Sequence, residues 1–303
     1  MSIYLGIDTS NYTTSVATVG DEFRNIRKII DIKEGMRGIR QSDGVFVHLK
    51  ELPKLFETLD IDMKKVSAVG VSTRPRNVEG SYMPVFLAGE SFAKVIAKAL
   101  DVPLLSYSHQ DGHIMAGILS AESDELLVEP FLAVHMSGGT TEILECSYEN
   151  NHFTAKLIGG TKDISAGQLI DRVGVSLGMK FPAGAEMDRL SQDCCEKAIP
   201  LKTSVKGGYI NFSGMETKLL SMKDEVNAEL LAKSTLTFIG KSLAEAINFH
   251  EPKKVLFVGG VASNTLLREY FKKEIRAKIY FASRELSCDN AVGIAELCRR
   301  NFL

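Results

Sequence analysis

The sequence lacks the cysteine pattern of a disulfide framework or of a thiolate zinc site. It has five cysteines in 303 residues, an odd number, and no two of them form a CxxC pair. A folded chain of this length buries about three quarters of its unfolded surface, so the fold needs no covalent cross-links. We therefore predict free thiols and a reducing compartment.

Long apolar runs are also absent. No stretch reaches the roughly 18 uncharged residues that are needed to span a bilayer. The apolar run at 3–7 meets Asp8 and has no basic residues before it, unlike a signal peptide. We expect a soluble, cytoplasmic protein that does not bind membranes.

There is no excess of basic charge. Lys and Arg number 36 against 38 for Asp and Glu, which gives a net charge of −2. With 45% hydrophobic and 24% charged residues, the composition excludes a wholly disordered chain, and the length favours two domains. Any contact with a nucleic acid must therefore use a local basic patch.

Two segments share one local design. The apolar run 3–7 leads into Asp8-Thr9-Ser10 and then into a β-rich segment at 13–19. The run 131–136 leads into Ser137-Gly138-Gly139-Thr140-Thr141 and a second β-rich segment. Both patterns predict a strand, a small polar turn and a strand, so we expect two halves of related design.

Apolar spacing in the rest of the chain predicts strands that alternate with helices, which is typical of an α/β fold. The expected strands cover 66–72, 104–107, 255–258 and 279–282. The expected helices cover 83–100, 110–120, 167–177, 185–191, 225–250, 264–274 and 289–300.

Three turns are suited to binding a ligand, although each one alone is more simply explained as a tight turn. The amides of the turn at 137–140 could bind an anionic oxygen, since glycine allows close approach. Asp8, Thr9 and Ser10 offer hydroxyls beside a carboxylate, which suits a phosphate or a cation such as Mg²⁺. The segment 259–264 follows a strand and opens a helix, where a nucleotide could rest. It is not GxGxxG, and the chain has no Walker A motif. The order of the three turns resembles the nucleotide-binding architecture of actin, sugar kinases and Hsp70.

His109 and His113 are four residues apart, so on a helix both imidazoles face the same side and could share a metal ion. A chance pair on a surface helix is the alternative. The motif is not HExxH, because Gln110 stands after the first histidine. A third ligand is needed, and the candidate carboxylate is Asp289, whose alternative role is to cap the helix that follows it.

The order of motifs over nearly the whole chain resembles the tRNA threonylcarbamoyladenosine synthase family (TsaD-like, formerly classed as a glycoprotease). The motifs are LGIDTS at 5–10, HQDGH at 109–113, MSGGTTE at 136–142, AGQLIDRVGVSLGMKFPAG at 166–184, NFSGMETK at 211–218, VGGVASNTLLR at 258–268 and SCDNAVGIAE at 287–296.

The resemblance implies two actin-like lobes, 1–124 plus 283–303 and 125–282, with a ligand cleft between them. It also implies one divalent metal, iron or zinc, held by His109, His113 and Asp289.

The resemblance further implies an adenylate ligand: AMP, ATP or threonylcarbamoyl-AMP. The implied contacts run from the acyl-phosphate to the base, with Asp171 and Asp188 at the ribose, Gly184 against the nucleoside and Asn264 at the base. The full set is Met136, Ser137, Gly138, Gly139, Asp171, Gly184, Asp188, Gly260 and Asn264. The simpler alternatives are surface charges for the two aspartates, a turn glycine for Gly184 and a helix cap for Asn264.

The implied reaction transfers a threonylcarbamoyl group from its mixed anhydride with AMP to the N6 amine of a tRNA adenosine. No catalytic base can be assigned. The alternatives are a non-catalytic actin-like paralogue that binds nucleotide and scaffolds a tRNA-modification complex, a peptidase, and a kinase of the same superfamily. A homodimer or a paralogous partner is expected in the scaffold case.

Several motifs depart from the family pattern. The acidic segment after the first turn is replaced by Ser10-Asn11-Tyr12-Thr13-Thr14, and a glycine-proline-glycine segment by residues 74–80 with Arg74 and Arg76. The family motifs SGGH, AGE and GGP become SGGT at 137–140, AGQ at 166–168 and AGA at 183–185. We therefore predict a divergent paralogue, whose acyl group or acceptor differs.

Overall fold

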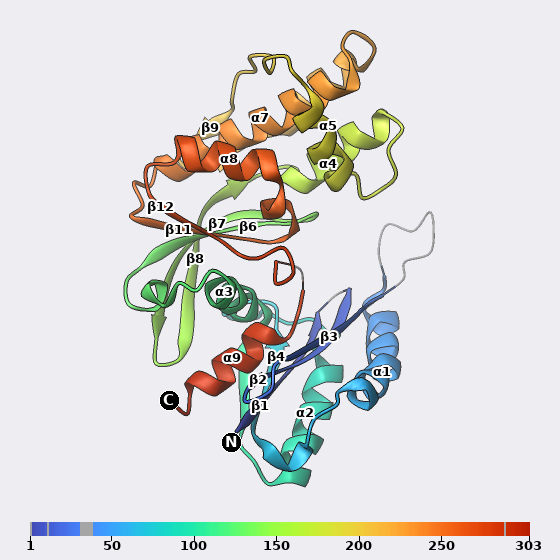
Figure 1. Ribbon diagram of the computed structural model, residues 1–303, viewed down its shortest axis with the longest axis vertical. Coiled ribbons are helices and arrows are strands. Elements are labelled where there is room, and N and C mark those ends of the chain that lie inside the picture. Colours follow the sequence, from blue (N-terminus) through green and yellow to red (C-terminus); the bar gives the residue numbers. More distant parts are fainter. Residues whose placement is uncertain (1, 11, 31–38, 288) are drawn as a thin grey trace. The chain divides into compact units, whose positions relative to one another are not determined.

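The computed structural model describes residues 2–10, 12–30, 39–287 and 289–303. Asn11 and Cys288, which belong to two of the predicted motifs, lie outside the described residues. The chain forms two compact units, each with its own sheet (Figure 1). The first comprises 1–124, 148–154 and 288–303, and the second comprises 125–147 and 155–287.

The first unit contains a five-stranded sheet in the order β3-β2-β1-β4-β5. Strand β1 is antiparallel to β2 and parallel to β4. The strands are β1 (Ile3–Ser10), β2 (Thr13–Gly20), β3 (Arg24–Ile29), β4 (Val66–Arg74) and β5 (Leu104–Ser108). The helices are α1 (Gln41–Thr58), α2 (Phe86–Leu100), α3 (His109–Ser120) and α9 (Val292–Arg300).

Helices cover both faces of this sheet. Figure 1 shows α1 and α2 on one side and α9 on the other. Gly6 lets α9 approach closely, because a Cβ there would lie 2.5 Å from the Ala291 carbonyl oxygen. Strands β1 and β2 are buried on both faces as a result, which explains the nearly continuous apolar run of β1, whereas the edge strand β3 is partly exposed.

Helices α3 and α9 cross without room for side chains at the crossing point. A Cβ on Gly293 would collide with the carbonyl oxygen of Gly112, and Gly112 itself faces Ile294. This contact brings the first two turns of α3 next to the residues that lead into α9, so it joins two segments that lie far apart in the sequence.

The second unit contains a seven-stranded sheet in the order β12-β11-β6-β7-β8-β10-β9. Its strands are β6 (Phe131–Met136), β7 (Thr141–Glu149), β8 (His152–Thr161), β9 (Val205–Lys206), β10 (Tyr209–Ile210), β11 (Lys254–Val258) and β12 (Lys278–Phe281). Strand β6 is antiparallel to β7 and parallel to β11.

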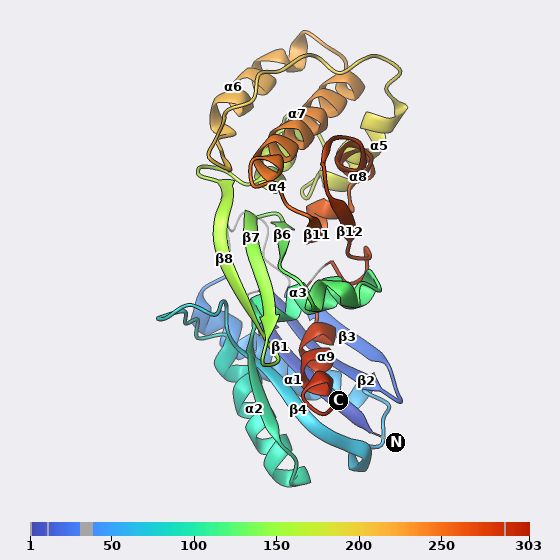
Figure 2. The same ribbon diagram turned by 90° about the vertical axis from the view of Figure 1, so that its left-hand side faces the viewer.

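Five α-helices belong to the described part of this unit, and Figure 2 shows them at one end of its long strands. They are α4 (Ala166–Ser176), α5 (Gly184–Asp193), α6 (Ser213–Ser221), α7 (Ala228–Asn248) and α8 (Thr265–Glu274). The core of the unit lies where α7 and α8 meet the sheet, for example at Leu243, Phe257 and Phe271.

The two units repeat one topology. Strands β8-β7-β6-β11-β12 of the second sheet follow the same order as β3-β2-β1-β4-β5 of the first. In both sheets the first strand pairs antiparallel with the next strand of the chain on one edge. On its other edge it pairs with a parallel strand, β4 or β11. The predicted α/β class and the two halves of related design are therefore confirmed. The cleft between lobes stays a prediction.

The two units do not follow the lobe boundaries expected from the sequence. Residues 283–287 group with the second unit, since Ser287 Oγ donates to the Ser283 carbonyl at 2.6 Å and Arg284 binds Thr265. Residues 148–154 group with the first unit, where the His152 ring packs against Tyr107 in a tilted arrangement with ring centroids 5.6 Å apart.

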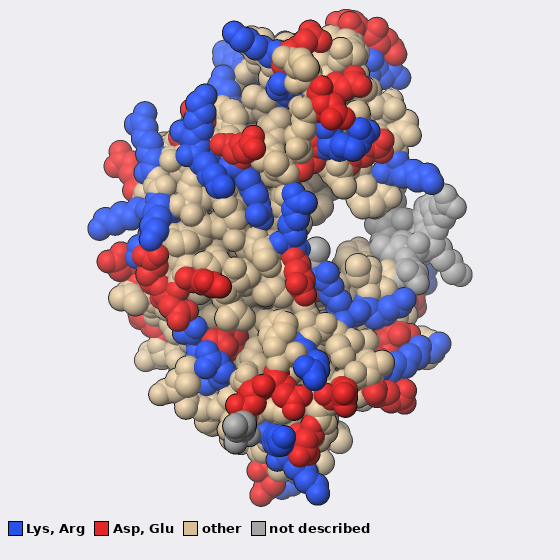
Figure 3. Space-filling model, viewed as in Figure 1, with Lys and Arg blue, Asp and Glu red and all other residues tan. Residues whose placement is uncertain are grey.

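The surface carries both charge signs. On the face shown in Figure 3, Lys and Arg side chains are interspersed with Asp and Glu. No α-helix in the described part of the chain combines the length and the apolarity needed to cross a membrane.

Candidate metal centre and nucleotide pocket

Helix α3 begins at His109 because Ser108 caps it. Ser108 Oγ accepts from the Asp111 amide at 3.1 Å, and the Asp111 carboxylate accepts from the Ser108 amide at 3.0 Å, which is a capping box. Asn77 Nδ2 also donates to both Asp111 oxygens at 2.7 Å. The helix start fixes His109 and His113 on one face, and the Asp111 carboxylate is held by the capping box and by Asn77.

Three donor atoms converge beside this helix. His113 Nε2 lies 3.0 Å from both His109 Nε2 and Asp289 Oδ1, and His109 Nε2 lies 3.7 Å from Asp289 Oδ1. We call His109, His113 and Asp289 the HHD cluster. Their side chains are 21%, 7% and 33% exposed, so the cluster is open on one side.

Asp289 is not a helix cap. The N-cap of α9 is Ala291, and the side chain that accepts from the Val292 amide belongs to Asn290, at 2.9 Å. The capping alternative for Asp289 is therefore wrong. Its Oδ2 atom accepts a hydrogen bond from Thr13 Oγ1 at 3.3 Å, which orients the carboxylate while Oδ1 faces the histidines.

A buried carboxylate lies behind the cluster. Asp8 Oδ1 contacts His109 Nδ1 at 3.0 Å and accepts a hydrogen bond from Ser72 Oγ. When Nδ1 of a histidine donates to a carboxylate, its Nε2 atom is left as a lone-pair donor, an arrangement common behind metal-bound histidines. The sequence pattern suggested Asp8 for a phosphate or cation loop, whereas the structure places it behind His109.

The other two residues of that loop are also buried. Thr9 Oγ1 donates to the Val85 carbonyl at 3.0 Å and accepts from the Gly89 amide at 3.1 Å. Thr9 thus fastens α2 to the sheet, and its hydroxyl is not available to a ligand. Ser10 Oγ is buried as well.

Electrostatics in the cluster favour a proton on His109. Burial lowers the pKa of this imidazole, but the charge of Asp8 and the hydrogen bonds that the ring donates to Asp289 and Asp8 outweigh it and raise the pKa to about 10. Burial also opposes the charge on Asp289, yet its contacts with the two histidines hold its pKa well below the usual range. Without a metal, the cluster is stabilised by this proton.

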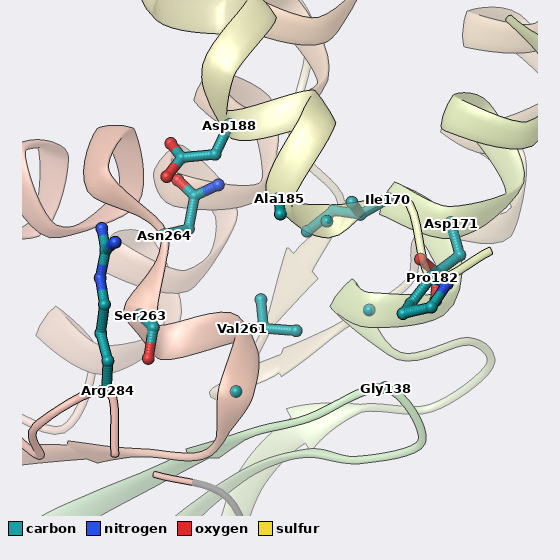
Figure 4. Close-up of a pocket in the computed structure, with 13 residues that line it drawn as sticks. Gly138, Ile170, Asp171, Pro182, Ala185, Asp188, Val261, Ser263, Asn264 and Arg284 are labelled. Carbon is teal, nitrogen blue, oxygen red and sulfur yellow. The ribbon is translucent and has the colours of Figure 1, made fainter. Parts of the chain in front are cut away.

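A cavity of about 490 Å³ lies in the second unit (Figure 4). It is bounded by the turn after β6, by α4 and α5, by the segment before α8 and by one arginine after β12. Its lining residues are Gly138, Gly167, Ile170, Asp171, Pro182, Gly184, Ala185, Asp188, Gly260, Val261, Ser263, Asn264 and Arg284.

Six of the nine predicted nucleotide contacts line this cavity: Gly138, Asp171, Gly184, Asp188, Gly260 and Asn264. Met136 does not line the cavity, because it ends β6 and its side chain is fully buried in the core. Ser137 and Gly139 do not line the cavity either. They flank Gly138 in a turn closed by the Ser137 amide and the Thr140 carbonyl at 2.8 Å.

Glycines give the cavity its space. A Cβ added at Gly138, Gly184 or Gly260 would meet no atom within 4 Å, so these positions face open volume. At Gly167, by contrast, a Cβ would lie 2.5 Å from the backbone of Gly138, so this glycine permits close packing of α4 against the turn.

The two aspartates are structural as well as exposed to the cavity. Asp171 Oδ1 accepts from the Ala183 amide at 2.8 Å, and burial raises the pKa of its carboxyl. Asp188 accepts from the amides of Thr265 and Leu266 at 2.8 and 3.3 Å. Neither is a plain surface charge.

The alternative role of Asn264 as a helix cap is correct, since its Oδ1 atom accepts from the Leu267 amide at 2.9 Å at the start of α8. Gln168 stands where the family motif AGE has a glutamate, and it still caps α4. Gln168 completes a capping box with Ser165, whose amide donates to Gln168 Oε1 at 3.0 Å.

Arg284 is a cavity residue that no sequence pattern indicated. It lies in an irregular segment with no motif around it, so its position could not be read locally. In the segment 74–80, which departs from the family pattern, the Arg74 guanidinium donates to Asn77 Oδ1 at 2.6 Å.

Comparison with known proteins agrees with the geometry. The sequence model of the family "TsaD: tRNA N6-adenosine threonylcarbamoyltransferase" matches residues 48–296. Proteins with that name are similar to this chain over nearly its full length. One from Thermus thermophilus is 33% identical, covering 96% of this chain and 90% of the relative. The one from Carboxydothermus hydrogenoformans is 31% identical, covering 99% and 92%.

Solved structures show the fold. The activator of 2-hydroxyisocaproyl-CoA dehydratase from Clostridium difficile superposes with a TM-score of 0.55 at 15% identity, covering 99% of this chain and 96% of that one. HypF from T. kodakarensis superposes with a TM-score of 0.61 at 13% identity, covering 99% of this chain and 47% of that one. The predicted fold of the actin, sugar kinase and Hsp70 type is confirmed.

Proposed function

The chain belongs to the tRNA N6-adenosine threonylcarbamoyltransferase family and is a transferase, and we propose that it moves a threonylcarbamoyl or related carbamoyl group from a mixed anhydride with AMP to the N6 amine of a tRNA adenosine. The observation that carries the proposal is the convergence of His109, His113 and Asp289. No observation favours the non-catalytic scaffold.

The HHD cluster fits one divalent ion, iron or zinc. Two ligands about 2.1 Å from an ion and roughly 90–110° apart are separated by about 3.0–3.4 Å. Two of the three donor separations, both 3.0 Å, match this spacing, and the third, 3.7 Å between His109 Nε2 and Asp289 Oδ1, is wider. Two imidazoles and one carboxylate leave open positions on such an ion, which suits catalysis more than a structural role.

A bound ion would act as a Lewis acid that polarises the carbamoyl carbonyl. The protein contributes orientation. Asp8 holds the His109 ring through Nδ1, and Thr13 holds the carboxylate of Asp289. Attack by the acceptor amine on the carbonyl carbon forms the new C–N bond and breaks the bond to the phosphate oxygen. AMP leaves with that electron pair, and the amine nitrogen gives up one proton to water.

The cavity of the second unit supports the adenylate part of the proposal. Ile170, Ala185 and Val261 give it apolar surface for a base, and Asp171 keeps one carboxylate oxygen for a ribose hydroxyl. The amides of Gly138 and Gly139 have no partner within the described structure and suit a phosphate. The dehydratase activator with this fold was solved with bound ADPNP.

The test is to compare the wild type with His109→Ala and with His152→Ala, a histidine outside the HHD cluster. We expect wild type and His152→Ala to hold about one iron or zinc ion per chain by mass spectrometry and to transfer the group to tRNA. His109→Ala should lose both the metal and the transfer, but keep AMP binding. Full transfer by metal-free His109→Ala would contradict the proposal.

A further inference from the structure

One stretch of the second unit is strongly basic. Residues 253–284 contain eight Lys or Arg and two Glu, a net charge of +6, in a chain whose total is −2. The stretch runs from β11 through α8 to β12 and the segment after it. Figure 3 shows Lys and Arg side chains over α8 and β12. Because the chain as a whole is slightly acidic, a local basic patch of this kind is what a contact with a nucleic acid requires.

Ion pairs neutralise one end of this stretch. Lys254 and Lys278 are partners in the register of β11 and β12, and they pair with Glu129 at 3.0 Å and with Glu125 at 2.6 Å. These pairs cancel the charge of both lysines. An anion would therefore find uncompensated cations elsewhere in the stretch.

Three other cations follow the seam between α8 and β12, and we call them the cationic row: Arg268, Lys272 and Arg284. The Arg268 guanidinium lies 4.9 Å and the Lys272 ammonium 5.9 Å from the centre of the Phe281 ring. Arg268 and Lys272 are one helical turn apart, about 6 Å along the axis of α8. Arg284 Nη2 donates to Thr265 Oγ1 at 3.0 Å, at the first residue of α8, so it lies about one turn before Arg268.

None of the three forms an ion pair with a carboxylate in the described part of the chain. Arg268 donates to the carbonyls of Ala262 and Ala282, which carry no net charge. Lys272 is exposed, and Arg284 keeps most of its five N–H groups for a ligand. Burial and the neighbouring charge of Arg284 lower the pKa of Arg268. Anionic groups bound along the seam would relieve this repulsion between the cations.

One end of the cationic row belongs to the nucleotide cavity. Arg284 is among the lining residues, and Figure 4 shows its side chain beside Ser263 and Asn264. Arg268 and Lys272 are not among them, so the row leads out of the cavity along the surface. The regular spacing of the row suits a chain of charges more than a single small anion. The phosphates of a nucleic acid strand form such a chain.

We propose that the cationic row binds phosphates of the tRNA backbone and guides the strand that carries the acceptor adenosine toward the cavity. The inference rests on the proposed function and adds the surface on which the tRNA docks. Contacts with phosphates carry no base sequence, so the row supplies affinity and register rather than recognition of a base.

The experiment measures binding of an unmodified tRNA to the intact chain, by fluorescence anisotropy at several salt concentrations. The test variant combines Lys272→Ala with Arg284→Ala and removes two charges of the row. Arg268 is kept, because its guanidinium also holds two backbone carbonyls. The matched control combines Lys218→Ala with Lys223→Ala, which removes the same charge from exposed positions of the same unit on and after α6.

Each lost phosphate contact should lower the slope of log affinity against log salt by about 0.7–0.9, which at about 0.1 M salt means about five- to eightfold weaker binding. The test variant should therefore bind tRNA about 25- to 60-fold more weakly than the wild type, with a slope lower by about 1.4–1.8. The control should bind tRNA as the wild type does. Lys272→Ala alone should bind AMP as the wild type does in calorimetry, because Lys272 does not line the cavity.

A test variant that binds tRNA as tightly as the control, with the same slope, would overturn the inference and leave the proposed function standing. Polyglutamate is the probe for a protein partner with an acidic surface. If the wild type bound polyglutamate as tightly as tRNA at the same salt, the row would be a general anion surface and the assignment to tRNA would be wrong. A wild type that neither binds tRNA nor transfers a group to it would overturn the proposed function itself.

Discussion

The HHD cluster and the cavity of the second unit are built in opposite ways. The cluster consists of side chains held by other side chains, such as Asp8 behind His109 and Thr13 against Asp289. The cavity consists largely of missing side chains at Gly138, Gly184 and Gly260, framed by helix starts. We therefore expect metal binding at the HHD cluster to be lost when side-chain atoms are removed, and ligand binding in the cavity to be lost when atoms are added.

The largest effect is expected from removing a donor at the cluster. Asp289→Asn keeps the shape of the side chain but removes its charge, and it should weaken zinc binding by more than about a hundredfold, beyond the usual loss for an outer-shell change. AMP binding should stay as in the wild type. Competition with a zinc-chelating dye measures zinc affinity, and calorimetry measures AMP affinity. If Asp289→Asn lost both, the cluster and the cavity would not be independent sites, and the comparison would fail.

The counterpart at the cavity is to add atoms. Gly184→Val places a branched side chain in open volume and should weaken AMP binding by up to about a hundredfold, the worth of overpacking by about 1–3 kcal/mol. Metal content should not change. Gly214→Val is the control, since Gly214 also faces open space but lies on α6 away from the cavity. Equal weakening in both variants would show a general effect on folding.

A smaller effect is expected behind the cluster. Asp8→Asn leaves all three donors in place but weakens the orientation of the His109 ring, so zinc affinity should fall by about tenfold, at the low end for such changes because Ser72 remains. Dye competition measures it. An unchanged affinity would show that the contact between Asp8 and His109 does not orient the ring.

The last prediction concerns pH. Because the pKa of His109 is raised to about 10, the metal-free imidazole is protonated at neutral pH and must lose a proton when the ion binds. Zinc affinity should therefore rise by about tenfold for each unit of pH between about 7 and 9. Asp8→Asn, which removes the charge that raises the pKa of His109, should flatten this slope, and a flat profile in the wild type would contradict the protonated state.

Local patterns predicted the parts of the fold that depend on neighbouring residues. The two hairpins, the helix at 109–120 and the shared face of His109 and His113 follow from spacing and from the cap at Ser108. Helix α1 was not predicted, because Gly44, Pro53 and several polar residues interrupt its pattern. It is held by packing, with His48 and Leu52 fully buried.

Contacts between distant segments were beyond local patterns. The position of Asp289 depends on the crossing of α3 and α9 at Gly112 and Gly293. The sequence pattern offered Asp289 as a candidate ligand, and the family resemblance assigned it to the metal. The position of Asp188 against α8 likewise depends on a contact between distant segments. Neither pattern nor resemblance indicated Arg284, because its place depends on how the chain after β12 returns past Thr265.

The central claim is that His109, His113 and Asp289 hold one catalytic divalent ion. Anomalous diffraction at the zinc and iron edges from crystals of the metal-containing protein tests it most directly. We expect a single peak between His109 Nε2, His113 Nε2 and Asp289 Oδ1. A stoichiometric ion bound elsewhere on the chain, with no peak at these three atoms, would contradict this claim.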